Sequence, residues 1–146
     1  MVEKVSGVDL VRWLGVQLDE DERIARAAGE RVDPDWGDDE EHVYSLPHGY
    51  PVAFGSVDSY MDGGLRTHIA EHDPARVLRE TDTKRRQVEW CVEVIGARDL
   101  SRYDEVGSLK DDKDALAVTL AVETLRLLAL PYDGRDGYQE AWRPSE

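Results

Sequence analysis

The sequence predicts an α+β fold that is mainly helical, with three main helices and a β-hairpin inserted between the first and the second. Two observations lead to this expectation. Apolar side chains recur at intervals of three and four residues in two long segments, the spacing of one face of a helix, and a third long segment is apolar in nearly every helical direction. The stretch from residue 30 to residue 64 is instead interrupted by eight proline and glycine residues, which excludes a long helix there. The chain has 146 residues, 40% of them hydrophobic, and this is enough for a single domain with its own core.

The first helix is expected over about residues 8–28. Leu10, Leu14 and Leu18 lie four residues apart and therefore share one face of a helix. Gly29 follows the periodic segment, and a glycine just past a helix relieves the strain of a left-handed backbone. We therefore expect this helix to end before Gly29.

The β-hairpin is expected within the loop-rich stretch of residues 30–64. Residues 43–46 and 52–57 are rich in residues that favour strands. Between them, residues 47–51 contain two prolines and a glycine, a composition typical of turns. Two antiparallel strands joined by this turn are the simplest arrangement.

The second helix is expected over about residues 74–95. Asp73 can accept hydrogen bonds from free backbone amides at the helix start, and Pro74 suits the first helical position. Gly96 is the expected stop. Cys91 lies on the apolar face, where a lone cysteine is usually inert core packing.

The third helix is expected over about residues 112–130, before Pro131. Its apolar side chains point in nearly every direction, which is typical of a buried, central helix. In the tail of residues 131–146, Tyr138 and Trp142 lie four residues apart and suit one last helical turn packed on the core.

The charge of the chain limits its partners. It has 32 acidic and 18 basic residues, a formal net charge of −14. Nucleic acids and anionic membrane surfaces would repel such a protein, so neither is expected as the main partner. No run of about 18 apolar residues and no apolar stretch of signal-peptide type is present, so we expect a cytoplasmic protein. One cysteine allows neither an internal disulfide nor a zinc site built from several cysteines.

Three sequence blocks carry a family resemblance. They are DLVRWL at residues 9–14 with its acidic continuation, HIAEHDPARVLRE at residues 68–80, and LRLLALPY at residues 125–132. In combination the blocks resemble a family of unknown function made up of small acidic proteins from actinobacteria and their phages. The resemblance implies no activity. It also implies cysteines of a metal knuckle between the second and third blocks, but residues 92–122 contain none.

The most specific chemical motif is H-x-x-E-H, formed by His68, Glu71 and His72. On a helix the two histidines would lie one turn apart and could share a zinc ion, with Glu71 placed to deprotonate a bound water. However, only about two turns of helix fit between the preceding glycines and Asp73. A zinc hydrolase would also need a third ligand. We therefore expect no cofactor and favour imidazoles that brace a corner between helices, while zinc stays open.

Two further candidate binding features follow from the sequence. The basic residues can hold a phosphate or an acidic partner, or can pair with the surplus acids of the chain; they are Arg76, Arg79, Lys84, Arg85 and Arg86. Tyr50, at the hairpin turn, can anchor a protein partner because exposed aromatic side chains often carry interface energy.

The preferred function is a non-enzymatic protein-binding or regulatory module, located in the host cytoplasm if a phage encodes it. The first alternative is a metal-dependent hydrolase that uses the H-x-x-E-H motif. The second is a phage structural or accessory protein, which would form a homo-oligomer. Acidity favours the first of the three functions, because a negative surface steers association with basic proteins.

Overall fold

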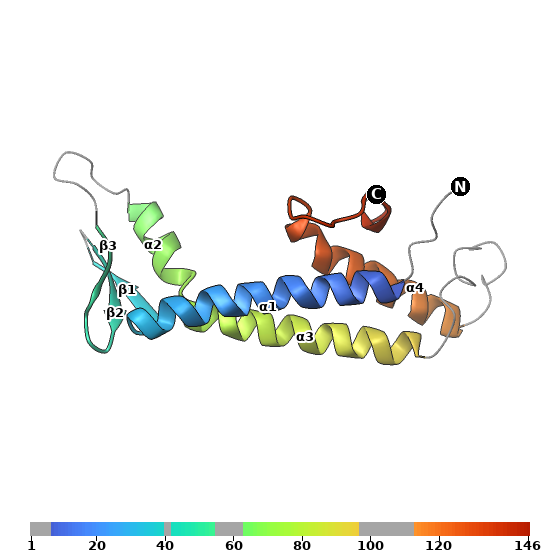
Figure 1. Ribbon diagram of the computed structural model, residues 1–146, viewed down its shortest axis with the longest axis horizontal. Helices are drawn as coiled ribbons and strands as arrows, with labels where there is room; N and C mark the ends of the chain where they lie inside the picture. Colours follow the sequence, from blue (N-terminus) through green and yellow to red (C-terminus); the bar gives the residue numbers. More distant parts are fainter. Residues whose placement is uncertain (1–6, 40–41, 55–62, 97–112) are drawn as a thin grey trace. The chain divides into compact units, whose positions relative to one another are not determined.

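The computed structural model describes residues 7–39, 42–54, 63–96 and 113–146. Its secondary structure confirms the predicted class, a mainly helical α+β fold with a small sheet between the first two long helices (Figure 1). The chain divides into two compact units. The helical unit comprises Met1–Leu18 and Thr83–Glu146, and the sheet unit comprises Asp19–Asp82. Whether they act as a single domain stays a prediction.

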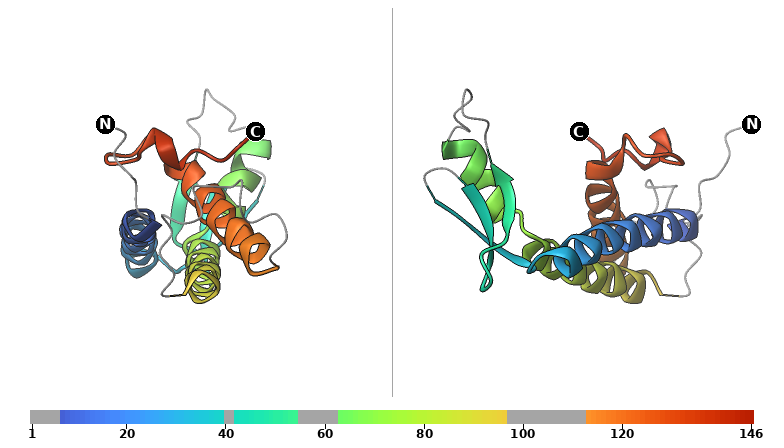
Figure 2. Two further views of the ribbon diagram at one scale, coloured as in Figure 1. Left: turned by 90° about the vertical axis from the view of Figure 1, so that its right-hand side faces the viewer. Right: turned by 60° about the vertical axis from the view of Figure 1, so that its left-hand side comes forward.

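The helical unit is built from parts of two α-helices, the whole of a third and two 3-10 turns. These are α1 (Gly7–Arg31), α3 (Pro74–Ile95), α4 (Lys113–Ala129), η2 (Leu130–Tyr132) and η3 (Glu140–Trp142). The first part of α1 and the last part of α3 run side by side in opposite directions, and are seen nearly end-on in the left view of Figure 2. Both pack against one face of α4 through a common core.

The core of the helical unit follows the predicted spacing. Leu10, Leu14 and Leu18 are all buried on α1, and Cys91 lies beside them in the same cluster. Burial raises the pKa of the Cys91 thiol, because the thiolate loses its hydration. The predicted role of Cys91 as core packing therefore fits its position.

The prediction that α4 is buried around most of its circumference is wrong. Its buried residues are small or medium-sized and lie on one side; they are Ala115, Val118, Ala121, Leu125 and Ala129. On the other side Leu116, Leu120 and Leu127 are 73%, 67% and 57% exposed. The core of this unit is only large enough to cover one face of the helix.

The apolar composition of α4 also bears on membranes. Contrary to the expectation from the sequence, the described part of the chain contains one segment, Ala115–Tyr132, that is long and apolar enough to cross a membrane, with a mean hydropathy of 1.4. Core helices of globular proteins meet the same criterion, and a third of this window is buried (33%). The segment also contains Glu123 and Arg126, which form an ion pair of 2.7 Å.

The tail packs on the core through aromatic rings, as expected. Trp142 is buried, and its ring centroid lies 5.3 Å from that of Trp13 and 5.9 Å from that of Tyr138. The Trp13 indole donates a hydrogen bond of 3.0 Å to the Asp136 carbonyl. The next residue, Gly137, has a φ of +85°, and a Cβ atom there would lie 2.9 Å from the same indole nitrogen. Only glycine fits this turn without strain.

The sheet unit contains three antiparallel strands and a short helix. The strands β1 (Asp35–Asp38), β2 (His42–Leu46) and β3 (Pro51–Phe54) lie in the order β1-β2-β3. The pairing of β2 with β3 confirms the predicted hairpin, although residues 55–57 of the expected second strand lie outside the described residues. The strand β1 and the helix α2 (Gly63–Glu71) are additional to the main elements that the sequence predicts. The helix α2 packs on β1 and β2, as the right view of Figure 2 shows.

The predicted ends of the long helices are partly confirmed. The helix α3 begins at Pro74 after Asp73, and Gly96 follows its end with a φ of +60°. However, α1 does not stop at Gly29 but continues to Arg31. A Cβ atom on Gly29 would lie 3.1 Å from the Pro34 Cβ atom, so this glycine serves a close approach of the following chain rather than the helix end.

Candidate functional site

Two carboxylates fix the chain that leads from α1 into β1. The first, Asp33, accepts hydrogen bonds from the Ser45 hydroxyl (2.8 Å) and the His48 backbone amide (3.1 Å). It also bonds the His48 imidazole through Nδ1 at 2.8 Å. The imidazole bond lowers the pKa of the Asp33 carboxyl below its ordinary value; desolvation opposes this shift, and the Ser45 bond supports it. Asp33 thereby holds the hairpin turn against the loop before β1.

The second carboxylate, Asp73, joins α3 to the sheet. One of its oxygens accepts the backbone amide of Arg76 at 2.7 Å, the predicted N-cap bond of α3. The other oxygen accepts the backbone amide of Trp36 at 3.1 Å. The Trp36 indole donates in turn to the Asp33 carbonyl at 2.9 Å. Trp36 is therefore held at both its backbone and its ring.

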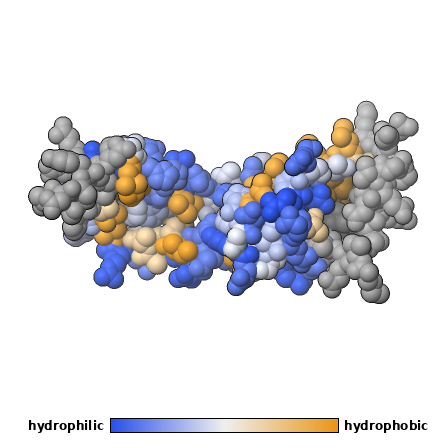
Figure 3. All heavy atoms as spheres, turned by 90° about the horizontal axis from the view of Figure 1, so that it is seen from above, coloured by the Kyte–Doolittle hydropathy of each residue, from blue (hydrophilic) through white to orange (hydrophobic). Residues whose placement is uncertain are grey.

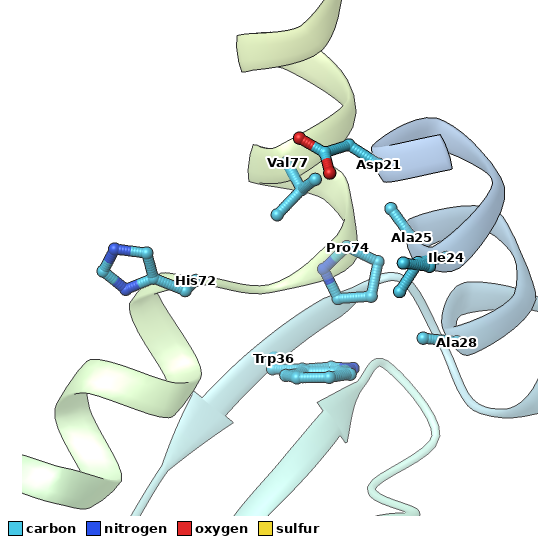
Figure 4. Close-up of a pocket in the computed structure, with 8 residues that line it drawn as sticks. All are labelled: Asp21, Ile24, Ala25, Ala28, Trp36, His72, Pro74 and Val77. Atoms are coloured by element: carbon cyan, nitrogen blue, oxygen red, sulfur yellow. The ribbon is translucent and has the colours of Figure 1, made fainter. Parts of the chain in front are cut away.

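A shallow apolar pocket of about 190 Å³ lies beside Trp36 in the sheet unit. Figure 4 shows the Trp36 ring below Pro74, with the side chains of α1 to the right and His72 to the left. The lining residues come from α1, β1, the turn between α2 and α3, and the start of α3; they are Asp21, Ile24, Ala25, Ala28, Trp36, His72, Pro74 and Val77. Asp21 and His72 are the only lining side chains that can ionise. Pockets for small-molecule ligands usually span about 300–1,000 Å³, so this one suits a smaller group.

The histidines of the H-x-x-E-H motif lie on and just after α2. The rings of His68 and His72 are 4.2 Å apart between centroids, and both residues are exposed. Nδ1 of His72 lies 2.8 Å from the His68 carbonyl oxygen. Because a carbonyl oxygen only accepts hydrogen bonds, this nitrogen must donate. The two imidazoles thus come together one turn apart, as predicted.

Glu71 points toward α3 rather than toward a shared metal position. Its carboxylate lies 3.7 Å from Nη1 of Arg76, and the same nitrogen donates 3.1 Å to the Glu71 carbonyl. In the described ranges no three His, Cys, Asp or Glu residues are grouped to hold a metal ion. The histidine pair therefore offers two of the ligands that a zinc hydrolase would need, and zinc binding stays a prediction.

The predicted basic cluster makes contacts within the protein. Arg76 pairs with Glu80 at 2.7 Å, and this hydrogen bond raises the pKa of the guanidinium. Lys84 donates 3.3 Å to the Tyr132 hydroxyl. Arg79, Arg85 and Arg86 also have interaction partners. These contacts favour internal pairing, and binding of an external phosphate stays a prediction.

Tyr50 is 51% exposed at the hairpin turn, where its ring stacks on that of His48 at 5.6 Å between centroids. Its predicted role as an anchor for a partner stays open. The pocket beside Trp36 was not anticipated from the sequence. The only available signal is the spacing of Asp21, Ile24 and Ala28, which places them on one face of α1.

The fold and the pocket define a small, mainly helical α+β protein with a shallow apolar recess and no assembled metal centre among its described residues. The chain belongs to a family of unknown function, DUF6221, whose model matches residues 7–144. This confirms the predicted membership of an uncharacterised family. No curated protein and no solved structure matches the chain.

Proposed function

We propose that this protein is a non-enzymatic protein-binding module that recognises a basic protein partner in the cytoplasm of an actinobacterium or of a phage host. The observation that carries the proposal is the α4 stripe, formed by Leu116, Leu120 and Leu127. All three side chains are more than half exposed, at 73%, 67% and 57%. Large apolar side chains that share one exposed face are typical of binding surfaces.

The three leucines lie on the same side of the helix, although Glu123 interrupts the stripe between Leu120 and Leu127. At about 100° per residue, Leu120 lies roughly 40° and Leu127 roughly 20° around the axis from Leu116. Val118 and Leu125, which are buried in the core, lie on the opposite side. Thus α4 presents one face to its own unit and a second apolar face to a partner. An amphipathic helix laid along such a face is a common mode of recognition.

Charge favours a basic partner over a second copy of the chain. Each copy carries a net charge of −14, so self-association brings like charges together. A basic protein is instead attracted by the acidic surface, and it can then bind the apolar residues of the α4 stripe. On the face drawn in Figure 3, hydrophobic groups lie at several separate places within a mainly hydrophilic surface. Charge would therefore steer the encounter, and the stripe would supply much of the affinity.

The test compares the wild-type protein with Leu116→Ser/Leu120→Ser in the full chain. Each tagged protein is used to capture partners from an actinobacterial lysate and is washed near 0.5 M salt. At this salt concentration, interactions between exposed charges more than about 4 Å apart are largely screened. The captured protein is then purified and titrated against both baits. Leu65→Ser is the matched control, because Leu65 is 50% exposed but lies on α2.

The expected result is a basic, stoichiometric partner whose affinity falls at least about tenfold in the double variant and stays unchanged in Leu65→Ser. Four results would overturn the proposal. These are a homodimer by light scattering that the double variant dissociates, binding of the wild type to lipid vesicles, metal-dependent turnover of a substrate, and a partner that binds both variants equally.

A further inference from the structure

We propose that the pocket beside Trp36 is a second recognition site, which accepts one apolar side chain of a protein segment that also carries a neighbouring basic residue. The inference deepens the proposed function and rests on it only in taking the partner to be a protein. It concerns the sheet unit alone, whereas the α4 stripe belongs to the helical unit. The two sites can therefore succeed or fail separately.

The size and lining of the pocket define the apolar half of the ligand. Its volume of about 190 Å³ is below that of typical cofactor or metabolite sites, but it is large enough for a leucine-sized side chain. Ile24, Ala28 and Val77 supply aliphatic surface, and Trp36 and Pro74 supply two rings. Anchor residues of protein interfaces commonly fill small pockets of this kind.

The charge at the pocket defines the basic half. Asp21 is the only acidic side chain in the lining. A carboxylate has several acceptor positions, so Asp21 can meet a lysine or arginine of the ligand in addition to its contacts within the protein. The net charge of −14 attracts the same kind of segment. An acidic segment or a second copy of this chain would be repelled.

The pocket is already in its binding shape because Trp36 is fixed. Its backbone amide is held by Asp73 at 3.1 Å, and its indole nitrogen by the Asp33 carbonyl at 2.9 Å. The turn before β1 is further tied to α3 by the bond from the Ala75 amide to the Pro34 carbonyl, at 3.0 Å. A recess held in this way costs little conformational entropy when it is filled.

The test uses the full chain labelled with 5-fluorotryptophan and observed by fluorine NMR. The four tryptophans give four resonances, and Trp36→Phe assigns the one of interest. The probe is N-acetyl-leucyl-arginine amide. We expect a saturable shift of the Trp36 resonance alone, with a Kd on the order of 1–10 mM. N-acetyl-alanyl-arginine amide should bind about tenfold more weakly or worse, because it lacks most of the apolar side chain.

Two pairs of variants locate the site. Ala28→Leu fills the pocket and should abolish the shift, whereas Ala27→Leu, an exposed change on the same helix, should leave it intact. Asp21→Asn should reduce, about two- to fivefold, the preference for the arginine probe over N-acetyl-leucyl-glutamate amide, because the remaining net negative charge still favours the arginine probe. Asp19→Asn, an exposed change two residues away on the same helix, should leave this preference unchanged. If Ala28→Leu does not fold, as judged by circular dichroism, the Asp21 pair decides.

The proposal is overturned if the Trp36 resonance does not respond, if all four resonances shift together, or if the variants at the pocket bind like their controls. An unresponsive Trp36 resonance combined with partner loss in the α4 stripe variant would remove this site and leave the proposed function standing. A Trp36 resonance that responds, combined with a partner that still binds the α4 stripe variant, would leave a peptide site and remove the α4 interface.

Discussion

Replacing Asp73 by alanine should destabilise the sheet unit by about 2–3 kcal/mol. Asp73 is buried, and its two oxygens accept separate backbone amides, from Arg76 at 2.7 Å and from Trp36 at 3.1 Å. Loss of an N-cap costs about 1 kcal/mol. Loss of the acceptor for the half-buried Trp36 amide adds about 1–2 kcal/mol, because that donor is then left unsatisfied. Asp73→Asn should cost less, about 1 kcal/mol, because asparagine caps helices well and keeps one acceptor oxygen.

The free energy of unfolding is measured by urea denaturation followed by circular dichroism, with exchange of the Trp36 amide hydrogen as a local readout. Protection of this amide should fall in Asp73→Ala. The matched control is Asp82→Ala, an exposed carboxylate on the same helix, which should change stability by less than about 0.5 kcal/mol. If Asp73→Ala also changes the free energy of unfolding by less than about 0.5 kcal/mol, or if the Trp36 amide keeps its protection, Asp73 does not stabilise the unit through its two backbone hydrogen bonds.

Three other predictions concern the core, a turn and acid stability. Leu125→Ala should cost about 3 kcal/mol because Leu125 is 1% exposed, whereas Leu127→Ala, at an exposed position on the same helix, should cost less than about 1 kcal/mol in urea unfolding. Gly137→Ala should cost at least about 1 kcal/mol through its φ of +85° and its contact with an indole, whereas Gly134→Ala, with nothing within 4 Å, should be close to neutral in thermal melts. The pKa of Asp33 is lower in the folded state than in the unfolded state, so its contribution to stability is present above the unfolded value of about 3.9 and is lost as the pH falls through the folded value. Urea midpoints of wild type and Asp33→Asn should therefore differ at pH 7 and converge below about pH 4; a constant difference would contradict this.

The long helices could be predicted because their signals are local. The spacing of Leu10, Leu14 and Leu18 and the Asp73-Pro74 start each depend on a few neighbouring residues, and the structure places both as expected. Helix ends are less local. Gly29 has the composition of a stop, but whether it ends the helix depends on Pro34, which approaches it in the folded chain.

The burial of α4 and the strand β1 could not be predicted for the same reason. When a helix is apolar all around, its sequence does not indicate which side is buried. The buried side depends on how much apolar surface the rest of the unit provides. The strand β1 has the sequence DWGD, which is poor in strand-forming residues. It pairs with β2 because the register brings Trp36 opposite Ser45 and because Asp73 holds the Trp36 amide from the other side. Both causes are distant in sequence.

The clearest chemical motif of the sequence and the pocket meet at the same corner, and they lead to different functions. His72 closes the H-x-x-E-H motif and also lines the pocket, next to Pro74. Its Nδ1 is bound to the His68 carbonyl at the end of α2, whereas Glu71 contacts Arg76 and so joins α2 to α3. Asp73, directly after the motif, ties the same corner to β1. Together these contacts form a rigid edge for the apolar recess. The recognition site proposed beside Trp36 rests on this rigid edge.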